Sequence, residues 1–257
     1  MYEIYRDCLR NEDPVALVTV VNGPDVGAKL LVRPDHEPVG TLGDPDLDRV
    51  VARDALAELE AGATEVRHYG PHGEARMDDV AVFIESRAPR AQMLIFGAVD
   101  FTRALADQGK LLGFRVTVCD AREVFATEMR FPMADEVVVD WPHRLIERAA
   151  DRLGPRDAIC VLTHDNKFDV PAIVAALATD VGYIGAMGSR RTHAKRVEKL
   201  LEAGVTQSQL TRVKAPIGLD IGARTPEETA VSVVAEIISN RTGHQAASLS
   251  VTTGPIH

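Results

Sequence analysis

Residues 93–120 read MLIFGAVDFTRALADQGKLLGFRVTVCD, and their pattern is the strongest indication of the fold. Its first four residues are apolar, as expected of a short strand that is buried on both faces of a parallel sheet. Gly97 then turns the chain into a helix that Gly113 ends, and residues 115–119 form a second apolar run. This order of strand, turn, helix and strand predicts the βαβ unit of a Rossmann-like fold.

The same alternation of strands and helices continues to about residue 240. Further strands are predicted at residues 136–139, 158–162 and 181–184. Helices are predicted at residues 142–153, 169–178 and 189–203, and after a capping box at residues 225–228. We therefore predict an α/β protein with a doubly wound parallel sheet over residues 91–240, followed by an irregular tail at residues 241–257.

The N-terminal part has a different pattern. Short β-like runs at residues 15–21, 29–32, 64–69 and 80–85 surround one amphipathic helix at residues 44–62, and residues 40–43 are predicted as a loop. A polar segment with a proline follows at residues 85–90, which is typical of a domain boundary. The sequence thus predicts a smaller α/β domain over residues 1–86.

Composition narrows the class of protein. A net charge of -9 argues against a general nucleic-acid binder, which normally carries a basic surface. We find no signal-peptide pattern and no apolar run long enough to cross a membrane, so we expect a cytoplasmic protein. Cys8, Cys119 and Cys160 form no CxxC pair, the latter two lie in apolar runs and should be buried, and we expect no metal site.

The turn after the first strand is one candidate ligand site, because ligands of doubly wound sheets bind at the carboxyl ends of the strands. Residues 97–102 read GAVDFT, which keeps only the first glycine of GxGxxG. Val99 stands where a pyrophosphate usually approaches the backbone, while Asp120 occupies the place of a ribose-binding acid. NAD(P) binding through Gly97, Ala98 and Asp120 remains one interpretation, and a Rossmann-like fold without a dinucleotide remains the other.

The turn at residues 185–191, GAMGSRR, is the most informative stretch. Gly185 and Gly188 would let the backbone approach a ligand, and Ser189 stands at a helix N-terminus, where amide groups and the helix dipole favour an anion. Arg190 and Arg191 supply bidentate donors suited to phosphate, and His193, Lys195 and Arg196 add further basic groups. The alternative is a solvated basic helix face.

Two more strand-end segments carry polar residues. His164 and Asp165 could perform acid–base chemistry, or they could cap the helix that follows. Residues 215–223 contain Asp220 between two glycines, which suggests either a shaped loop beneath a ligand or a structural turn.

Five ordered motifs in the C-terminal part resemble the XdhC/CoxI family, the maturation factors of molybdenum hydroxylases. These motifs are LIFGA, GFRVTVCDAR, LTHDNKFDVPA, YIGAMGSRRT and PIGLDIGARTPEE, between residues 94 and 228. The resemblance implies a Rossmann-like domain, an N-terminal XdhC-type domain, and a homodimer that binds molybdenum cofactor and delivers it to an apo-hydroxylase. It also places Arg122 and Asp220, with the glycine-turn residues named above, among the cofactor-binding residues.

The chain departs from the family at two places, which identifies it as a divergent member. The first glycine loop of the family usually reads GAGH, whereas residues 97–100 read GAVD. The N-terminal family segment GGGC corresponds to residues 40–45, GTLGDP, which contain no cysteine. A thiolate therefore cannot hold the cofactor at that place.

Three functions follow as hypotheses. The first is a chaperone that delivers molybdopterin or its dinucleotide to a hydroxylase of the xanthine dehydrogenase or carbon monoxide dehydrogenase type, which would not be a free-standing enzyme. The second is an NAD(P)-dependent oxidoreductase. The third is a scaffold that only contacts partner proteins. Fold alone does not separate them, so the site residues must.

Overall fold

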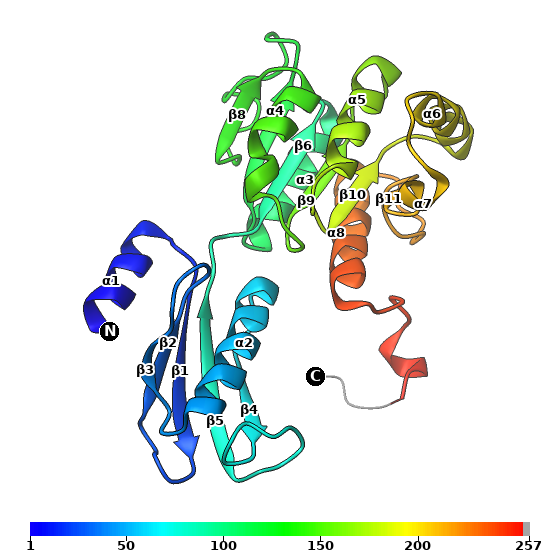
Figure 1. Cartoon of the computed structure of the whole chain (residues 1–257). Coiled ribbons are helices and arrows are strands. Elements are labelled where there is room, and N and C mark those ends of the chain that lie inside the picture. The colour runs from blue at the N-terminus through cyan, green and yellow to red at the C-terminus, as the bar shows by residue number, and fades with distance from the viewer. Residues whose placement is uncertain (254–257) are drawn as a thin grey trace. The chain divides into compact units, whose positions relative to one another are not determined.

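A computed structural model describes residues 1–253 of the chain. The chain forms two compact units, and the division falls between Pro89 and Arg90 (Figure 1). Within the described residues, no helix has both the length and the apolar composition needed to span a bilayer.

The N-terminal unit is an antiparallel sheet with one long helix against it. The sheet has the strand order β3-β2-β1-β5-β4. Its elements are α1 (Tyr2–Asn11), β1 (Val15–Asn22), β2 (Lys29–Val32), β3 (Val39–Thr41), α2 (Pro45–Ala61), β4 (Glu65–Tyr69) and β5 (Val80–Arg87). β1 pairs with both β2 and β5, so it forms the centre of the sheet.

Helix α2 has the boundaries that its sequence predicts. The Asp44 side chain accepts hydrogen bonds from the Asp46 and Leu47 amides, and Pro45 stands at the first helical position. Gly62 ends the helix in the left-handed conformation. The buried face of α2 packs with the inward side chains of the strands to form the core of this unit.

Two features of the N-terminal unit were not predicted. Residues 2–11 form α1, whose buried Cys8 packs beside Val15 and Leu31. Residues 39–41, predicted within or beside a loop, form the edge strand β3, in which Gly40 pairs with Leu30. An edge strand this short needs few apolar residues, so its sequence resembles that of a loop.

The C-terminal unit contains the predicted parallel sheet, with the strand order β11-β10-β9-β6-β7-β8. Its strands are β6 (Gln92–Phe96), β7 (Arg115–Asp120), β8 (Glu136–Val139), β9 (Ala158–Val161), β10 (Tyr183–Ala186) and β11 (Val213–Lys214). Its helices are α3 (Asp100–Leu111), α4 (Pro142–Ala149), α5 (Asn166–Leu177), α6 (Arg190–Glu202), α7 (Gln207–Leu210) and α8 (Pro226–Thr242), with the 3-10 turns η1 (Ala150–Arg152) and η2 (Leu249–Val251).

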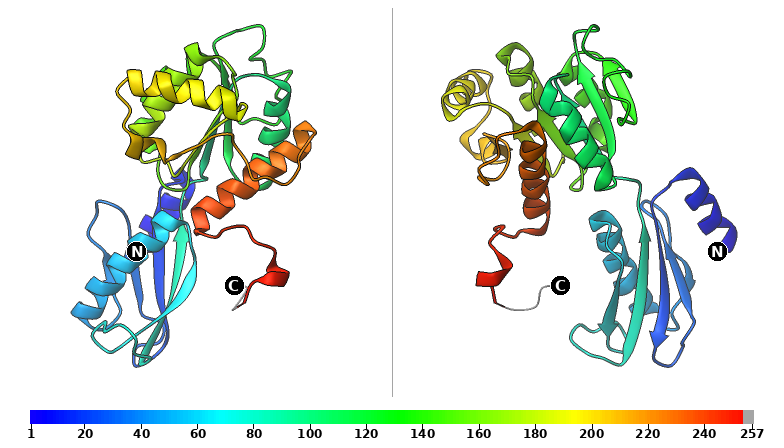
Figure 2. Two further views of the ribbon diagram at one scale, coloured as in Figure 1. Left: turned by 90° about the vertical axis from the view of Figure 1, so that its right-hand side faces the viewer. Right: turned by 180° about the vertical axis from the view of Figure 1, so that it is seen from behind.

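Helices cover both faces of this sheet, as the all-apolar strand at residues 93–96 predicts. Met93 and Ile95 point into a core shared with α3 and α8. Leu94 and Phe96 point into the opposite core, shared with α4, α5 and α6. Figure 2 shows these two layers from further sides. The three cysteines are buried and unpaired, which confirms the predicted burial of Cys119 and Cys160.

Some elements of this unit differ from the sequence-based expectation. Helix α5 begins at Asn166, three residues earlier than predicted, because Asp165 caps it. The short elements α7 and β11 were not predicted, and η2 lies in the segment for which no regular structure was expected.

The topology fixes where a ligand could bind. From β6, the chain continues to β7 on one side, whereas the strand on the other side of β6 is β9. The connections therefore leave the sheet in opposite directions at β6 and β9, which is the switch point where doubly wound folds bind ligands. The loops after β6, β7, β9 and β10 all begin at the edge of the sheet formed by the carboxyl ends of these strands.

Candidate functional site

The turn after β6 is tightly packed against the loop after β9. Gly97 has a φ of 106°, and a Cβ added there would lie 2.9 Å from the Thr163 amide nitrogen. The Gly97 amide donates to the Cys119 carbonyl at 2.9 Å, and the Thr102 hydroxyl donates to the Gly97 carbonyl. Gly97 is thus required by the close approach of two protein loops, whether or not a ligand is present.

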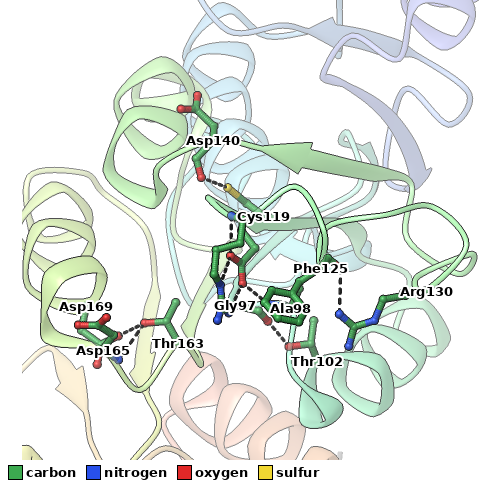
Figure 3. A network of polar contacts seen from close by, with 12 residues as sticks. Gly97, Ala98, Thr102, Cys119, Phe125, Arg130, Asp140, Thr163, Asp165 and Asp169 are labelled. Atoms are coloured by element: carbon green, nitrogen blue, oxygen red, sulfur yellow. Dashed lines mark hydrogen bonds and ion pairs between the residues drawn. The ribbon is translucent and has the colours of Figure 1, made fainter.

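The carboxylate of Asp120, at the end of β7, is fully hydrogen-bonded within the protein. Its carboxylate accepts hydrogen bonds from the Ala98 amide at 2.8 Å and from the Arg122 amide, Nε and Nη2 at 2.9, 2.9 and 2.8 Å. Figure 3 labels Ala98 and the neighbouring Gly97, Thr102 and Cys119. Burial by itself would raise the pKa of Asp120, but the hydrogen bonds from Arg122 and Ala98 outweigh it and lower the pKa.

This arrangement weakens the dinucleotide interpretation. Asp120 is only 3% exposed, so a ribose diol has no free carboxylate oxygen to reach. The Ala98 amide, which a pyrophosphate would need, already donates to Asp120. Val99 stands at the N-cap of α3 without a side-chain cap, as expected for a valine.

Arg122 is the residue that remains accessible at the β7 end. Its guanidinium lies 4.4 Å from the centroid of the Phe125 ring, and its side chain is 48% exposed. Arg122 and Asp120 line a small cavity with Thr163, Asp165 and Phe168. Of the residues predicted near the first glycine turn, Arg122 therefore keeps a surface for a ligand.

His164 and Asp165 have different roles at the β9 end. The Asp165 side chain accepts from the Lys167 amide at 2.9 Å and caps α5, which is the structural alternative considered above. His164 is exposed with a left-handed φ of 59°, and its ring has no polar partner within residues 1–253. The pair is thus not arranged as a hydrogen-bonded acid–base couple.

The two glycines of the β10 turn differ in role. Gly185 lies within β10 and is buried, and an added Cβ would lie 2.4 Å from the Ile217 side chain, so its role is packing. An approach of Gly185 to a ligand stays a prediction, because the structure itself accounts for this glycine by packing. Gly188 has a φ of 136° and immediately precedes Ser189, whose hydroxyl caps α6 by accepting from the Thr192 amide at 3.1 Å.

Arg190 and Arg191 begin α6 with their side chains in solvent. Neither has a hydrogen-bond or ion-pair partner among the described residues, and the first turn of α6 contains no acid. Together with Ser189 they line a cavity of about 640 Å³, whose opposite wall is the loop at residues 216–223. The structure thus brings Arg190, Arg191 and Asp220 to one open cavity.

The opposite wall of this cavity is rigidly held. The Ile217 amide donates to the Ala186 carbonyl at 3.1 Å, and the Gly218 amide donates to the Glu236 carboxylate at 2.9 Å. The Tyr183 hydroxyl donates to the same Glu236 oxygen at 2.6 Å. These hydrogen bonds hold the start of the loop against β10 and α8.

Arg196 does not belong to the basic surface predicted for this helix. It is fully buried, and its Nε and Nη2 donate to Asp169 of α5 at 3.1 and 2.6 Å, while Nη2 also donates to the Met187 carbonyl at 2.7 Å. The Thr163 hydroxyl donates to the other Asp169 oxygen. This buried group links the β9 and β10 loops.

Asp169 and Thr163 were missed by the sequence-based reasoning, although one signal was present. Asp169 and Ile173 are four residues apart on the buried face of α5, and Arg196 and Leu200 have the same spacing in α6. Two opposite charges on apolar helix faces indicate a buried ion pair.

Models of two families match the chain. The model of the XdhC Rossmann domain matches residues 93–237, which is more than half of the chain. The model described as the XdhC and CoxI family matches residues 8–70.

Three proteins of known sequence are similar to the chain. The uncharacterized protein YqeB of Escherichia coli (strain K12) is 31% identical over 238 residues, which cover 88% of this chain and 43% of that protein. A probable subunit of xanthine dehydrogenase from Bacillus subtilis (strain 168) is 32% identical over 194 residues, with coverages of 69% and 56%. The molybdenum cofactor insertion chaperone PaoD of Escherichia coli (strain K12) is 37% identical over 93 residues, with coverages of 36% and 29%.

The chain spans about half the length of the first two of these relatives. A crystal structure described as a xanthine dehydrogenase from Bacillus halodurans superposes with a TM-score of 0.65 at 23% identity, covering 96% of this chain and 68% of that chain. At that identity the likeness supports the fold. The two family matches carry the assignment: the chain belongs to the XdhC and CoxI family, and its C-terminal unit is an XdhC Rossmann domain.

Proposed function

We propose that the chain binds molybdenum cofactor and delivers it to a molybdenum hydroxylase of the xanthine dehydrogenase type. The observation that carries this proposal is the open basic turn at the start of α6. There, Arg190 and Arg191 face a cavity of about 640 Å³ without a protein partner among the described residues.

The charge pattern of α6 supports an anionic ligand. The first-turn amides of a helix lack intrahelical acceptors and carry partial positive charge, which favours acids over arginines at these positions. Here Ser189 satisfies one amide, and two arginines follow instead of acids. Two arginines at positions where they oppose the helix dipole fit a site for phosphate, which they and the amides can bind together.

Molybdopterin has a phosphate or, in its dinucleotide form, a pyrophosphate, so either form offers the required anion. In this proposal Arg190 and Arg191 hold the phosphate, and the loop at residues 216–223 bounds the rest of the cavity. Because no thiolate is available at residues 40–45, the anion site is the main anchor of the cofactor. An anchor that faces solvent also suits release to an acceptor.

The names of two relatives agree with this proposal. One is named as a probable subunit of xanthine dehydrogenase, and another as a molybdenum cofactor insertion chaperone. We extend that role to this chain and select the xanthine dehydrogenase type as the acceptor. The homodimer implied by the family resemblance stays a prediction, which light scattering of the purified protein would test.

The decisive experiment measures molybdenum and pterin content after purification from cells that produce the cofactor. We expect molybdenum and pterin close to stoichiometric in the unaltered protein. The double variant Arg190→Ala/Arg191→Ala should lose most of both, since each charge-assisted phosphate contact contributes roughly 1.5–3 kcal/mol.

The matched control removes two lysines from the same helix, away from the cavity. Lys195→Ala/Lys199→Ala lowers the net charge equally and should retain the cofactor. Equal retention by both double variants would place the phosphate elsewhere. No cofactor in the unaltered protein, together with co-purification of a hydroxylase, would favour the scaffold hypothesis instead.

A further inference from the structure

The guanidinium of Arg122 is held in place at the end of β7, on the edge of the sheet where a ligand could bind. Its Nε and Nη2 donate to Asp120 at 2.9 and 2.8 Å, and its plane lies over Phe125 at 4.4 Å from the ring centroid. An arginine held in this way has already lost most of its conformational freedom, so binding an anion costs little additional entropy.

The guanidinium also keeps a free edge. Its Nη1 has no hydrogen-bond partner within residues 1–253, and the side chain is 48% exposed at the mouth of a cavity of about 40 Å³. That cavity is large enough for water but not for a nucleotide, so a ligand group would sit at its mouth, against Arg122.

The position of Arg122 in the topology indicates the ligand class. In doubly wound folds, the acid at the end of the second strand of the unit binds the ribose 2′-hydroxyl, whereas a nearby arginine accommodates a 2′-phosphate. Here Asp120 is buried and accepts four hydrogen bonds from the protein, so it offers nothing to a diol. The exposed group at this position is cationic.

A second cation and aromatic side chains lie nearby. The Lys167 ammonium is 4.9 Å from the centroid of the Trp141 ring and 5.7 Å from that of Phe168. Phe168 lines the same cavity as Arg122 and Asp165. This edge of the sheet thus places two cations and two aromatic rings around the Asp165 carboxylate, and the rings offer surfaces on which a base can stack.

We propose that Arg122 is the specificity-determining residue of a nucleotide subsite that prefers a 2′-phosphorylated ribose to a free ribose diol. The subsite lies at the β7 end, three strands from the α6 turn, and it does not depend on the proposed cofactor delivery. The Ala98 amide already donates to Asp120 and is not available to a pyrophosphate, so the suitable probe is 2′,5′-ADP, which has no pyrophosphate.

Trp141 provides the readout, because it is the only tryptophan of the chain and its ring centroid lies 5.1 Å from that of Phe168. Titration of the full chain with 2′,5′-ADP should change the tryptophan fluorescence in a saturable way. The same titration with 5′-AMP should give a dissociation constant about tenfold higher or more, as expected for the loss of charge-assisted hydrogen bonds.

Variants separate this preference from a general loss of binding. Arg122→Ala should weaken 2′,5′-ADP about tenfold and leave 5′-AMP nearly unchanged, and Arg122→Lys should be intermediate. Arg130→Ala is the matched control, because Arg130 also lies near Phe125, at 5.6 Å, but is not among the residues that donate to Asp120. It should keep the preference.

Three outcomes would overturn the proposal: no saturable signal with 2′,5′-ADP, equal affinity for the two nucleotides, or equal losses for both in Arg122→Ala. The first two are read on the unaltered protein and are independent of how any variant folds. Arg190→Ala/Arg191→Ala should keep the nucleotide preference while losing molybdenum, so the two proposals can fail separately.

Discussion

The turns after β6 and β10 have similar sequences, but the polar groups of the first are hydrogen-bonded within the protein and the arginines of the second are not. Each follows an apolar strand, contains a glycine with positive φ and leads into a helix. After β6, the Ala98 amide and the Asp120 carboxylate bind each other, and Arg122 completes the group. After β10, Arg190 and Arg191 have no protein partner among the described residues. A glycine turn therefore indicates a ligand only where its polar groups remain free.

The two turns also rest on different supports. The β6 turn is held by backbone contact with the β9 loop at Gly97. The β10 turn is held from below by the buried Arg196–Asp169 pair, which also binds the Met187 carbonyl. The comparison predicts that each turn fails in its own way when its support is removed.

The largest loss of stability should follow from removing Arg196, which holds the turn after β10. Arg196→Ala leaves Asp169 buried without its cation, and breaking one partner of a buried pair typically costs about 3–5 kcal/mol of unfolding free energy. Urea denaturation measures this cost. Arg196→Met/Asp169→Leu should recover much of the loss, because no unpaired charge remains buried. A single variant as stable as the unaltered protein would mean that the pair does not support the turn.

A smaller loss of stability is expected from a substitution in the turn after β6. Gly97→Ala combines a positive φ with a Cβ that contacts the Thr163 backbone, and we expect a loss of about 2–4 kcal/mol. Gly113→Ala is the matched control, since Gly113 has a φ of 83° and an added Cβ would meet nothing within 4 Å. It should lose about 1–2 kcal/mol, from backbone strain alone. Equal losses would contradict the close packing of the two loops.

The smallest change in stability should follow from removing the two arginines of the turn after β10. Arg190→Ala/Arg191→Ala removes two cations that oppose the helix dipole, so the unfolding free energy at low salt should stay constant or rise by less than about 1 kcal/mol. Lys199→Ala removes a cation from the last turn, where it is favourable, and should have the opposite sign. A clear destabilisation by the arginine variant would show that these side chains have a structural role.

Much of the C-terminal fold follows from the sequence because its signals are local. A continuous apolar run at residues 93–96 requires burial on both faces, and the capping box at residues 225–228 starts α8 where predicted. Elements with weak local signals were missed: α1 has a single buried residue, and the edge strand β3 contains a glycine. Such elements depend on the rest of the domain for their stability.

The family, the parallel sheet and the basic start of α6 could be predicted from the sequence, because they depend on residue order and on periodicity along one segment. Which polar groups are free could be learned only from the folded chain. Asp120 accepts its hydrogen bonds from Ala98 and Arg122, and Arg196 of α6 donates to Asp169 of α5, which is 27 residues away. The apolar faces of α5 and α6 indicate that Asp169 and Arg196 are buried, but the order of the strands and of the helices between them decides which polar groups meet, and no local pattern encodes that order.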